Sequence, residues 1–236
     1  MNEAATPKGP QNPPRLTPER VAYWYFRLNG FLQIENFVVH PKLYGGQRTD
    51  ADLIGVRFPF RAERLIDDPD DVMQDDADRL QLLSDRTDIV IAEIKTGRCA
   101  LNGPWTNEEH QNIHRVLAAI GGLPADAIDD AANALYSAAS FDHPNHPRVR
   151  LILVGREPDG NIAQKYAGIT QLTWAEVLSF IFQRFHRYNR QKAQVDQWDD
   201  VGRYLKKLVG RDNERDFVKR VYELMGVRNS EPGPAK

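Results

Sequence analysis

The chain has 236 residues, of which 41% are hydrophobic and 27% are charged, and its formal net charge is −2. This composition is typical of a globular protein with one sizeable core, and no apolar run approaches the roughly 18–20 residues that a membrane-spanning helix needs. The N-terminal stretch lacks a signal-peptide pattern, and a single cysteine, Cys99, excludes an internal disulfide. We therefore expect a cytoplasmic protein with no membrane partner.

Charge is unevenly distributed along the chain. The segment from Ala62 to Asp88 holds ten acidic residues and three arginines, whereas Phe180 to Arg228 holds twelve lysines and arginines and seven acidic residues. Each segment is most simply a solvated surface. The alternative is that the basic part contacts phosphates and that the acidic part covers this basic cleft until substrate displaces it.

The first half of the chain predicts a helix and three strands. Residues 1–16 have the composition of a disordered tail. Thr17 is a candidate N-cap before Pro18, and Asn29-Gly30 should end this helix near Leu28. Three apolar segments are expected to form strands, at 31–40, 49–60 and 87–95. A turn at Lys42–Arg48 separates the first two strands. An acidic insertion at 61–87, which contains a short helix, separates the second strand from the third.

The second half is mainly helical. Two capping-box patterns, Thr106 to Glu109 and Thr173 to Glu176, should each open a helix. Further elements are expected from apolar periodicity: a helix at 125–139, strands at 148–155 and 169–172, and helices at 200–208 and 213–225. The pattern predicts a single α/β domain at 17–228, with a small mixed sheet flanked by helices, a helical C-terminal part at 173–228 and a disordered tail at 229–236.

The polar residues that end two neighbouring strands carry the functional prediction. Side chains at i and i+2 of a strand share a face, so Glu93 and Lys95 should point the same way, as should Asp50 and Asp52. Two carboxylates can hold a hard divalent cation, and a lysine beside them can orient a water molecule. The pattern Glu-x-Lys alone occurs often by chance. Here it ends an apolar strand, and the preceding strand carries acidic residues.

At these residues the chain resembles the PD-(D/E)xK nuclease superfamily, whose restriction-endonuclease-like core has the order α-β-β-β-α-β. Asp52 in TDADLIGV matches the family acid on the second strand, and Glu93-Ile94-Lys95 matches the (D/E)xK motif. Glu19 stands eleven residues before Gly30-Phe31, where many members place a helix glutamate. The resemblance covers Thr17 to Gly155. Thr-Asp-Ala-Asp replaces the family's Pro-Asp, which leaves Asp50 as a rival for Asp52.

The resemblance implies a metal-dependent endonuclease that hydrolyses phosphodiester bonds, in DNA, and leaves a 5′-phosphate. It implies that Asp52, Glu93 and the carbonyl of Ile94 bind Mg²⁺ or Mn²⁺, that Lys95 positions the attacking water and that Glu19 supports the metal. The missing targeting module suggests a homodimer or a targeting protein partner, and the superfamily's habits suggest a role in defence. Gln111 corresponds to a helix glutamine of some members, although a solvated residue is the simpler interpretation.

Other signals leave further hypotheses open. Arg184, Arg187 and Arg190 form a basic helix face that could contact nucleic acid. His110 and His114 have the spacing of zinc ligands, but exposed helix residues are the simpler interpretation. Cys99 should be a small packing residue. The alternatives to a nuclease are a non-catalytic nucleic-acid-binding or assembly subunit that retains the fold, and a protein that binds a partner through its acidic insertion.

Overall fold

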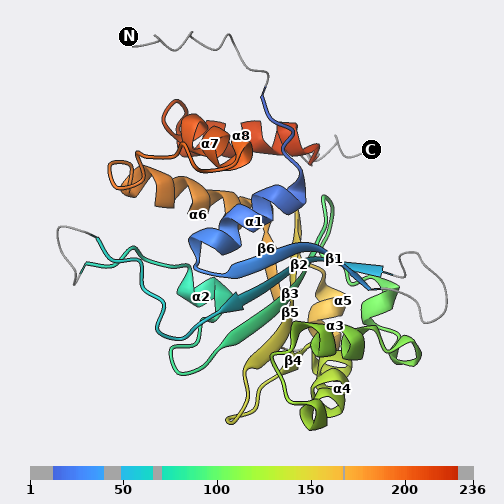
Figure 1. Ribbon diagram of the computed structural model, residues 1–236. Helices are drawn as coiled ribbons and strands as arrows, with labels where there is room; N and C mark the ends of the chain where they lie inside the picture. Colours follow the sequence, from blue (N-terminus) through green and yellow to red (C-terminus); the bar gives the residue numbers. More distant parts are fainter. Residues whose placement is uncertain (1–12, 40–48, 66–70, 167, 228–236) are drawn as a thin grey trace, which may run out of the picture.

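The computed structural model describes residues 13–39, 49–65, 71–166 and 168–227 (Figure 1). The predicted tail at 229–236 and the predicted turn at 42–48 lie outside these ranges. So do most of the tail predicted at 1–16 and residues 66–70 of the predicted acidic insertion. Within the described ranges, no helix combines the length and apolar character that crossing a membrane requires.

Six strands form one mixed sheet. Their bounds are β1 Leu32–Val39, β2 Thr49–Arg57, β3 Asp88–Ile94, β4 Ser140–Phe141, β5 Arg148–Gly155 and β6 Thr170–Thr173. The strand order is β1-β2-β3-β5-β4, and β6 also pairs with β5. β1, β2 and β3 are antiparallel neighbours, whereas β3, β5 and β6 run parallel. The predicted α/β class with a mixed sheet flanked by helices is confirmed.

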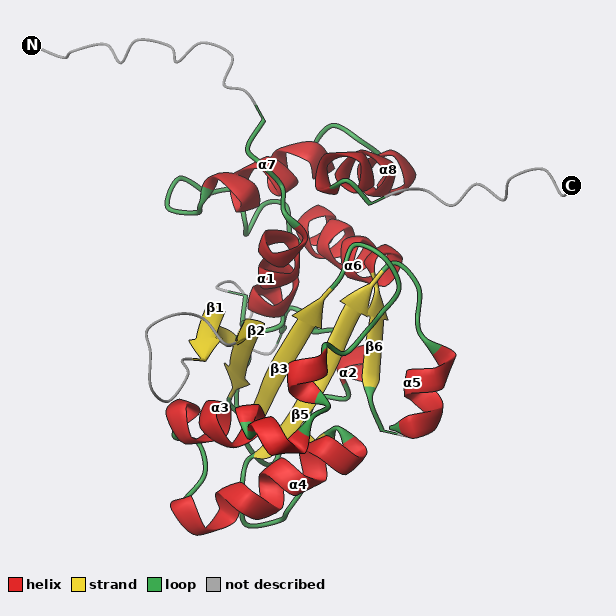
Figure 2. Ribbon diagram, turned by 90° about the vertical axis from the view of Figure 1, so that its right-hand side faces the viewer, coloured by secondary structure: helices red, strands yellow, loops and turns green. Residues whose placement is uncertain are grey.

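Helices cover both faces of this sheet (Figure 2). The first face carries α1 Pro18–Leu28 and α6 Trp174–Arg187, and α7 Asp200–Val209 and α8 Glu214–Met225 pack over these two helices. The second face carries α3 Asn112–Ile120 and α4 Ile128–Ala138. Two short helices, α2 Ala77–Leu80 and α5 Gly160–Lys165, lie in connections. The sequence pattern did not predict α5 or the two-residue strand β4.

β3 is buried along its whole length because both faces of the sheet are covered. Its side chains alternate between two hydrophobic cores, as strand geometry requires. Val90, Ala92 and Ile94 contribute to the first core, on the α1 face, and Ile89 and Ile91 contribute to the second core, on the α3 face. Glu93 continues the second series, so it projects toward the α3 face.

Helix starts were predicted with mixed success. Thr17 caps α1 by accepting from Arg20 N at 3.4 Å, and Thr173 and Glu176 form the predicted capping box of α6. The other predicted capping box, at Thr106, is wrong. The hydroxyl of Thr106 donates to the Gly103 carbonyl at 3.2 Å, and α3 begins only after Gln111, whose positive φ of 52° interrupts the helix.

β1 contains an irregularity at Asn36, whose φ is 51°. Cα pairing with β2 passes from Glu35↔Leu53 to Phe37↔Ala51 without a pair for Asn36. Asparagine tolerates this left-handed conformation better than most residues. On β2 the alternation shifts at the same level, because Ala51 and Ile54 both contribute to the second core. Asp52 therefore lies at the level of Asn36, where the pairing skips one position but keeps its register.

Candidate active site

The structure brings Asp52, Glu93 and Lys95 together at the end of β3. The register Leu53↔Ala92 makes Asp52 and Glu93 the next residues on adjacent strands. Beyond that pair, the Ile94 backbone N–H donates to Asp52 Oδ2 at 2.6 Å. The ammonium group of Lys95 forms an ion pair with Glu93 Oε1. Two carboxylates from adjacent strands and one ammonium group therefore lie together at the end of β3.

The carboxylate of Glu93 is desolvated but well supplied with donors. The residue is 3% exposed. Oε1 accepts from Lys95 Nζ and from Asn102 Nδ2, and Oε2 accepts from Trp105 Nε1 at 2.7 Å. Burial raises the pKa of Glu93 above that of an ordinary glutamate, and the negative charge of Asp52 adds to this effect. Lys95 and Trp105 oppose it by stabilising the carboxylate.

Lys95 has a fixed backbone and an accessible side chain. Its N–H donates to the Val154 carbonyl at 2.8 Å, and its carbonyl accepts from Trp174 Nε1 at 2.8 Å. The Lys95 side chain is 26% exposed. A lysine held in this way can reach solvent or a bound substrate without moving the strand.

The loop after Lys95 packs closely against the end of β5. Arg156 N donates to the Gly97 carbonyl at 2.6 Å, and Cys99 N donates to the Glu157 carbonyl at 2.8 Å. A side chain at Gly155 would lie 2.8 Å from Cys99 N, so the close approach requires glycine. Cys99 is fully buried, and burial raises the pKa of its thiol to about 12. Such a thiol is unsuited to act as a nucleophile.

The donor set suits a hard cation. Asp52, Glu93 and the Ile94 carbonyl offer oxygen ligands, and Mg²⁺ is commonly held by one or two carboxylates together with water and substrate phosphates. Among the residues that the structure describes, no group of three or more histidine, cysteine, aspartate or glutamate side chains could hold a metal ion. The zinc spacing of His110 and His114 is thus not realised as a cluster.

Comparisons with protein-family models, with curated proteins and with solved structures find no match for this chain. The resemblance to the nuclease superfamily therefore rests on the residues and on the arrangement of this site.

Glu19 is not part of this arrangement. It lies in the first turn of α1, which packs against the first face of the sheet, whereas Glu93 projects toward the second face. The negative charge of Glu19 acts on Glu35, whose pKa is raised mainly by burial and lowered by Arg20. The structure thus groups Glu19 with Glu35 and Arg20.

The two remaining candidates add little to the site. Asp50 lies in β2, but its side chain is outside the described part of the structure. Gln111 is exposed at the start of α3, as expected for a solvated residue. Two donors that the sequence pattern did not single out, Asn102 and Trp105, contact Glu93 instead. The only sequence signal for them is the turn Asn-Gly-Pro-Trp that follows the strand.

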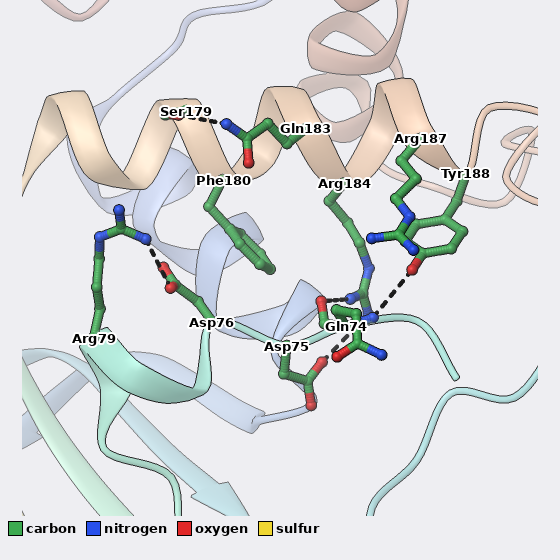
Figure 3. Close-up of a pocket in the computed structure, with 10 residues that line it drawn as sticks. All are labelled: Gln74, Asp75, Asp76, Arg79, Ser179, Phe180, Gln183, Arg184, Arg187 and Tyr188. Carbon is green, nitrogen blue, oxygen red and sulfur yellow. Dashed lines mark hydrogen bonds and ion pairs between the residues drawn. The ribbon is translucent and has the colours of Figure 1, made fainter. Parts of the chain in front are cut away.

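The predicted basic face of α6 needs a correction at Arg184. This residue is 2% exposed, and its guanidinium donates to the Gln74 carbonyl and pairs with Asp75 (Figure 3). It also donates to the Leu28 carbonyl and pairs with Glu63. Arg184 was predicted to contact nucleic acid, but it is an interior residue. Its orientation follows from partners that are distant in sequence, which helical periodicity cannot reveal.

Arg187 and Arg190 keep the predicted exposure. Arg187 lines a cavity of about 220 Å³ between α6 and the segment 74–79, together with Arg79 and Tyr188 (Figure 3). The basic face is therefore reduced to these two arginines.

The acidic insertion also differs from a purely solvated segment. Asp75 accepts from Arg57 at 2.9 Å and from Arg61 at 2.5 Å. Asp76 is 8% exposed and accepts from the Tyr25 hydroxyl at 2.8 Å. These contacts hold the described end of the insertion in the interior. The described part of the acidic insertion thus contacts basic residues through buried ion pairs, and not as a cover over an open basic cleft.

Proposed function

We propose that this protein is an Mg²⁺-dependent nuclease that hydrolyses phosphodiester bonds in DNA. The observation that carries the proposal is the meeting of Asp52, Glu93 and Lys95 at the end of a buried strand. A buried carboxylate is costly unless it is paired, and this one is paired with the lysine of the same motif. Desolvated charges of this kind are typical of functional sites.

The fold supports the proposal. The elements α1, β1, β2, β3, α3 and β5 follow one another in the order of a restriction-endonuclease-like core. β3 lies between β2 and β5, so the two acidic residues come from adjacent strands near the middle of the sheet. A fold alone does not define an activity, and the site residues are what make this order informative.

Each residue of the site has a role in the proposed reaction. Asp52, Glu93 and the Ile94 carbonyl would hold Mg²⁺ or Mn²⁺. When bound, the cation stabilises negative charge on the phosphate and lowers the pKa of water. Lys95 Nζ, at the accessible side of the site, donates a hydrogen bond that orients the attacking water and offsets charge in the transition state. Water attacks phosphorus and gives up a proton to solvent, the bond to the 3′ oxygen breaks, and this oxygen takes up a proton from solvent, which leaves a 5′-phosphate and a 3′-hydroxyl.

A direct test compares DNA cleavage by the unsubstituted chain and two lysine variants. Linear, circular and single-stranded DNA and RNA are incubated with Mg²⁺, Mn²⁺ or EDTA. Metal-dependent cleavage should be lost in Lys95→Ala and retained in Lys207→Ala, which removes an exposed lysine on α7. Absence of cleavage by the unsubstituted chain under all metal conditions would overturn the proposal.

The second candidate is a non-catalytic nucleic-acid-binding or assembly subunit that retains the nuclease fold. The exposed Arg187 and Arg190 favour it, because they offer positive charge to phosphates away from the site. DNA binding without cleavage would support this candidate. A homodimer or a targeting protein partner, and a role in defence, remain proposals that depend on the nuclease activity.

A further inference from the structure

We propose that Asn102 and Trp105 are positioning residues, which hold the Glu93 carboxylate in the orientation in which it shares a cation with Asp52. The inference rests on the proposed metal-dependent function and names residues outside the three-residue motif. Both residues contact Glu93 directly, and neither belongs to the strand that carries it.

The two donors act on different oxygens of Glu93. Trp105 Nε1 has one hydrogen to donate, and it donates to Oε2 at 2.7 Å. Asn102 Nδ2 donates to Oε1, which also accepts from Lys95. Rotation of the carboxylate about its terminal torsion would break at least one of these bonds. The pair of donors therefore selects one orientation of an otherwise broad torsion.

The donors are carried by one rigid turn. Gly103–Trp105 forms a 3₁₀ helix, and Trp105 N donates to the Asn102 carbonyl at 3.0 Å. Asn112, fully buried at the start of α3, donates from Nδ2 to the Pro104 carbonyl at 3.1 Å. Trp105 itself is 1% exposed and packs in the second core. Its indole cannot leave Glu93 without disturbing that core.

This arrangement has a consequence for cation binding. Groups that hydrogen-bond to metal ligands orient them, and their loss typically weakens metal binding by about 10–100-fold. Replacing Trp105 by phenylalanine keeps an aromatic ring in the core but removes the indole N–H that donates to Oε2. The carboxylate then loses its fixed orientation and part of the stabilisation of its charge.

The chain offers a matched control in Trp24. Its indole also donates to a carboxylate, Asp199 Oδ1 at 3.1 Å, and it is also 1% exposed. Trp24, however, lies in the first core, on the opposite face of the sheet. Trp24→Phe also removes a hydrogen bond from a buried indole to a carboxylate. It therefore measures the general effect of losing such a bond, at a position away from Glu93.

The test is calorimetric titration of the full chain with Mn²⁺, without DNA. Trp105→Phe and Asn102→Ala should each weaken Mn²⁺ binding by about 10–100-fold, whereas Trp24→Phe should bind Mn²⁺ like the unsubstituted chain. Asn102 is exposed, so Asn102→Ala decides the matter if Trp105→Phe does not fold.

The outcomes separate the two proposals. Unchanged Mn²⁺ binding in Trp105→Phe and Asn102→Ala, with binding by the unsubstituted chain intact, would overturn the inference alone. Equal weakening in Trp24→Phe would also overturn it, since the effect would then be a general loss of stability. Absence of Mn²⁺ binding by the unsubstituted chain would overturn the metal-dependent function and this inference with it.

Discussion

The ammonium group of Lys95, the residue that directly follows β3, pairs with the carboxylate of Glu93, two residues earlier in the chain. The spacing makes the contact possible, because residues i and i+2 of a strand project from one face. The Glu93 carboxylate thus already has a positively charged side chain beside it. A divalent ion that binds Glu93 must share this carboxylate with Lys95 or displace it.

We therefore expect Lys95→Ala to separate metal binding from catalysis. Cleavage should fall by about 100-fold or more, because a group that stabilises transition-state charge is lost. Mn²⁺ affinity should stay the same or increase, because a competing positive charge is removed from Asp52 and Glu93. Plasmid cleavage and calorimetric Mn²⁺ titration measure the two effects. Weaker Mn²⁺ binding in the variant would contradict the competition.

The raised pKa of Glu93 predicts a pH-dependent stability. The folded state holds the Glu93 proton more tightly than the unfolded state does, because burial disfavours the charged form. The stability that this group contributes is full below the unfolded pKa of about 4.3 and is lost as pH rises through the folded pKa. The slope from one group cannot exceed about 1.4 kcal/mol per pH unit.

Urea unfolding of the unsubstituted chain and of Glu93→Gln measures this contribution. The difference in the free energy of unfolding, unsubstituted minus variant, should decrease as pH rises from about 4. Glutamine does not titrate, so most other groups cancel in the difference. A difference that increases with pH would show that the Lys95 ion pair outweighs burial.

Arg184 and Arg187 should behave differently although they lie one helical turn apart on α6. Arg184→Leu should lower the free energy of unfolding by about 3–5 kcal/mol, because it breaks buried ion pairs with Glu63 and Asp75. Arg187→Leu, at an exposed position, should change it by no more than about 0.5 kcal/mol. Chemical denaturation compares the two variants.

For variants that remain soluble and folded, Arg187→Leu should affect DNA binding more than Arg184→Leu does. Arg187→Leu should weaken DNA binding, and the loss should shrink as salt concentration rises, since phosphate contacts depend on salt. Binding that does not change in Arg187→Leu would remove α6 from the proposed DNA contact surface.

Cys99 should be chemically silent in the folded protein. Its thiol is buried and has a pKa of about 12, so almost no thiolate is present near pH 8. An aromatic disulfide reagent should label Cys99 slowly in buffer and rapidly in urea. Rapid labelling of the folded protein would mean that the loop against β5 opens readily.

Much of the fold follows from local patterns. β3 and β5 were predicted within one residue at each end, because continuous apolar runs mark strands that are covered on both faces. α1 was predicted from Thr17 and Asn29-Gly30, and its ends are set by those residues. The proximity of Asp52 and Glu93 could be predicted because the two strands that carry them are consecutive in the sequence and pair with each other.

The rest depends on contacts that no local pattern encodes. Arg184 reads as a surface residue of an amphipathic helix, and its burial depends on Asp75, which lies 109 residues earlier. Trp105 reads as the end of a turn, and its contact with Glu93 depends on the direction in which that turn folds back. The failed helix start at Thr106 has a different origin: the exposed Gln111 takes a left-handed φ of 52° between the 3₁₀ helix Glu108–His110 and α3, and no residue in this segment signals that break.

The irregularity at Asn36 has a consequence for the outer border of the sheet. β1 has no strand beyond it among the described residues, and Leu32 and Ile34 are 65% and 58% exposed. A long, flat and apolar border of this kind is a template on which strands of other molecules can assemble. The left-handed residue divides the paired stretch of β1 into Leu32–Glu35 and Phe37–Val39. The same irregularity that lies opposite Asp52 thus interrupts this border, which makes it a poorer template for edge-to-edge aggregation.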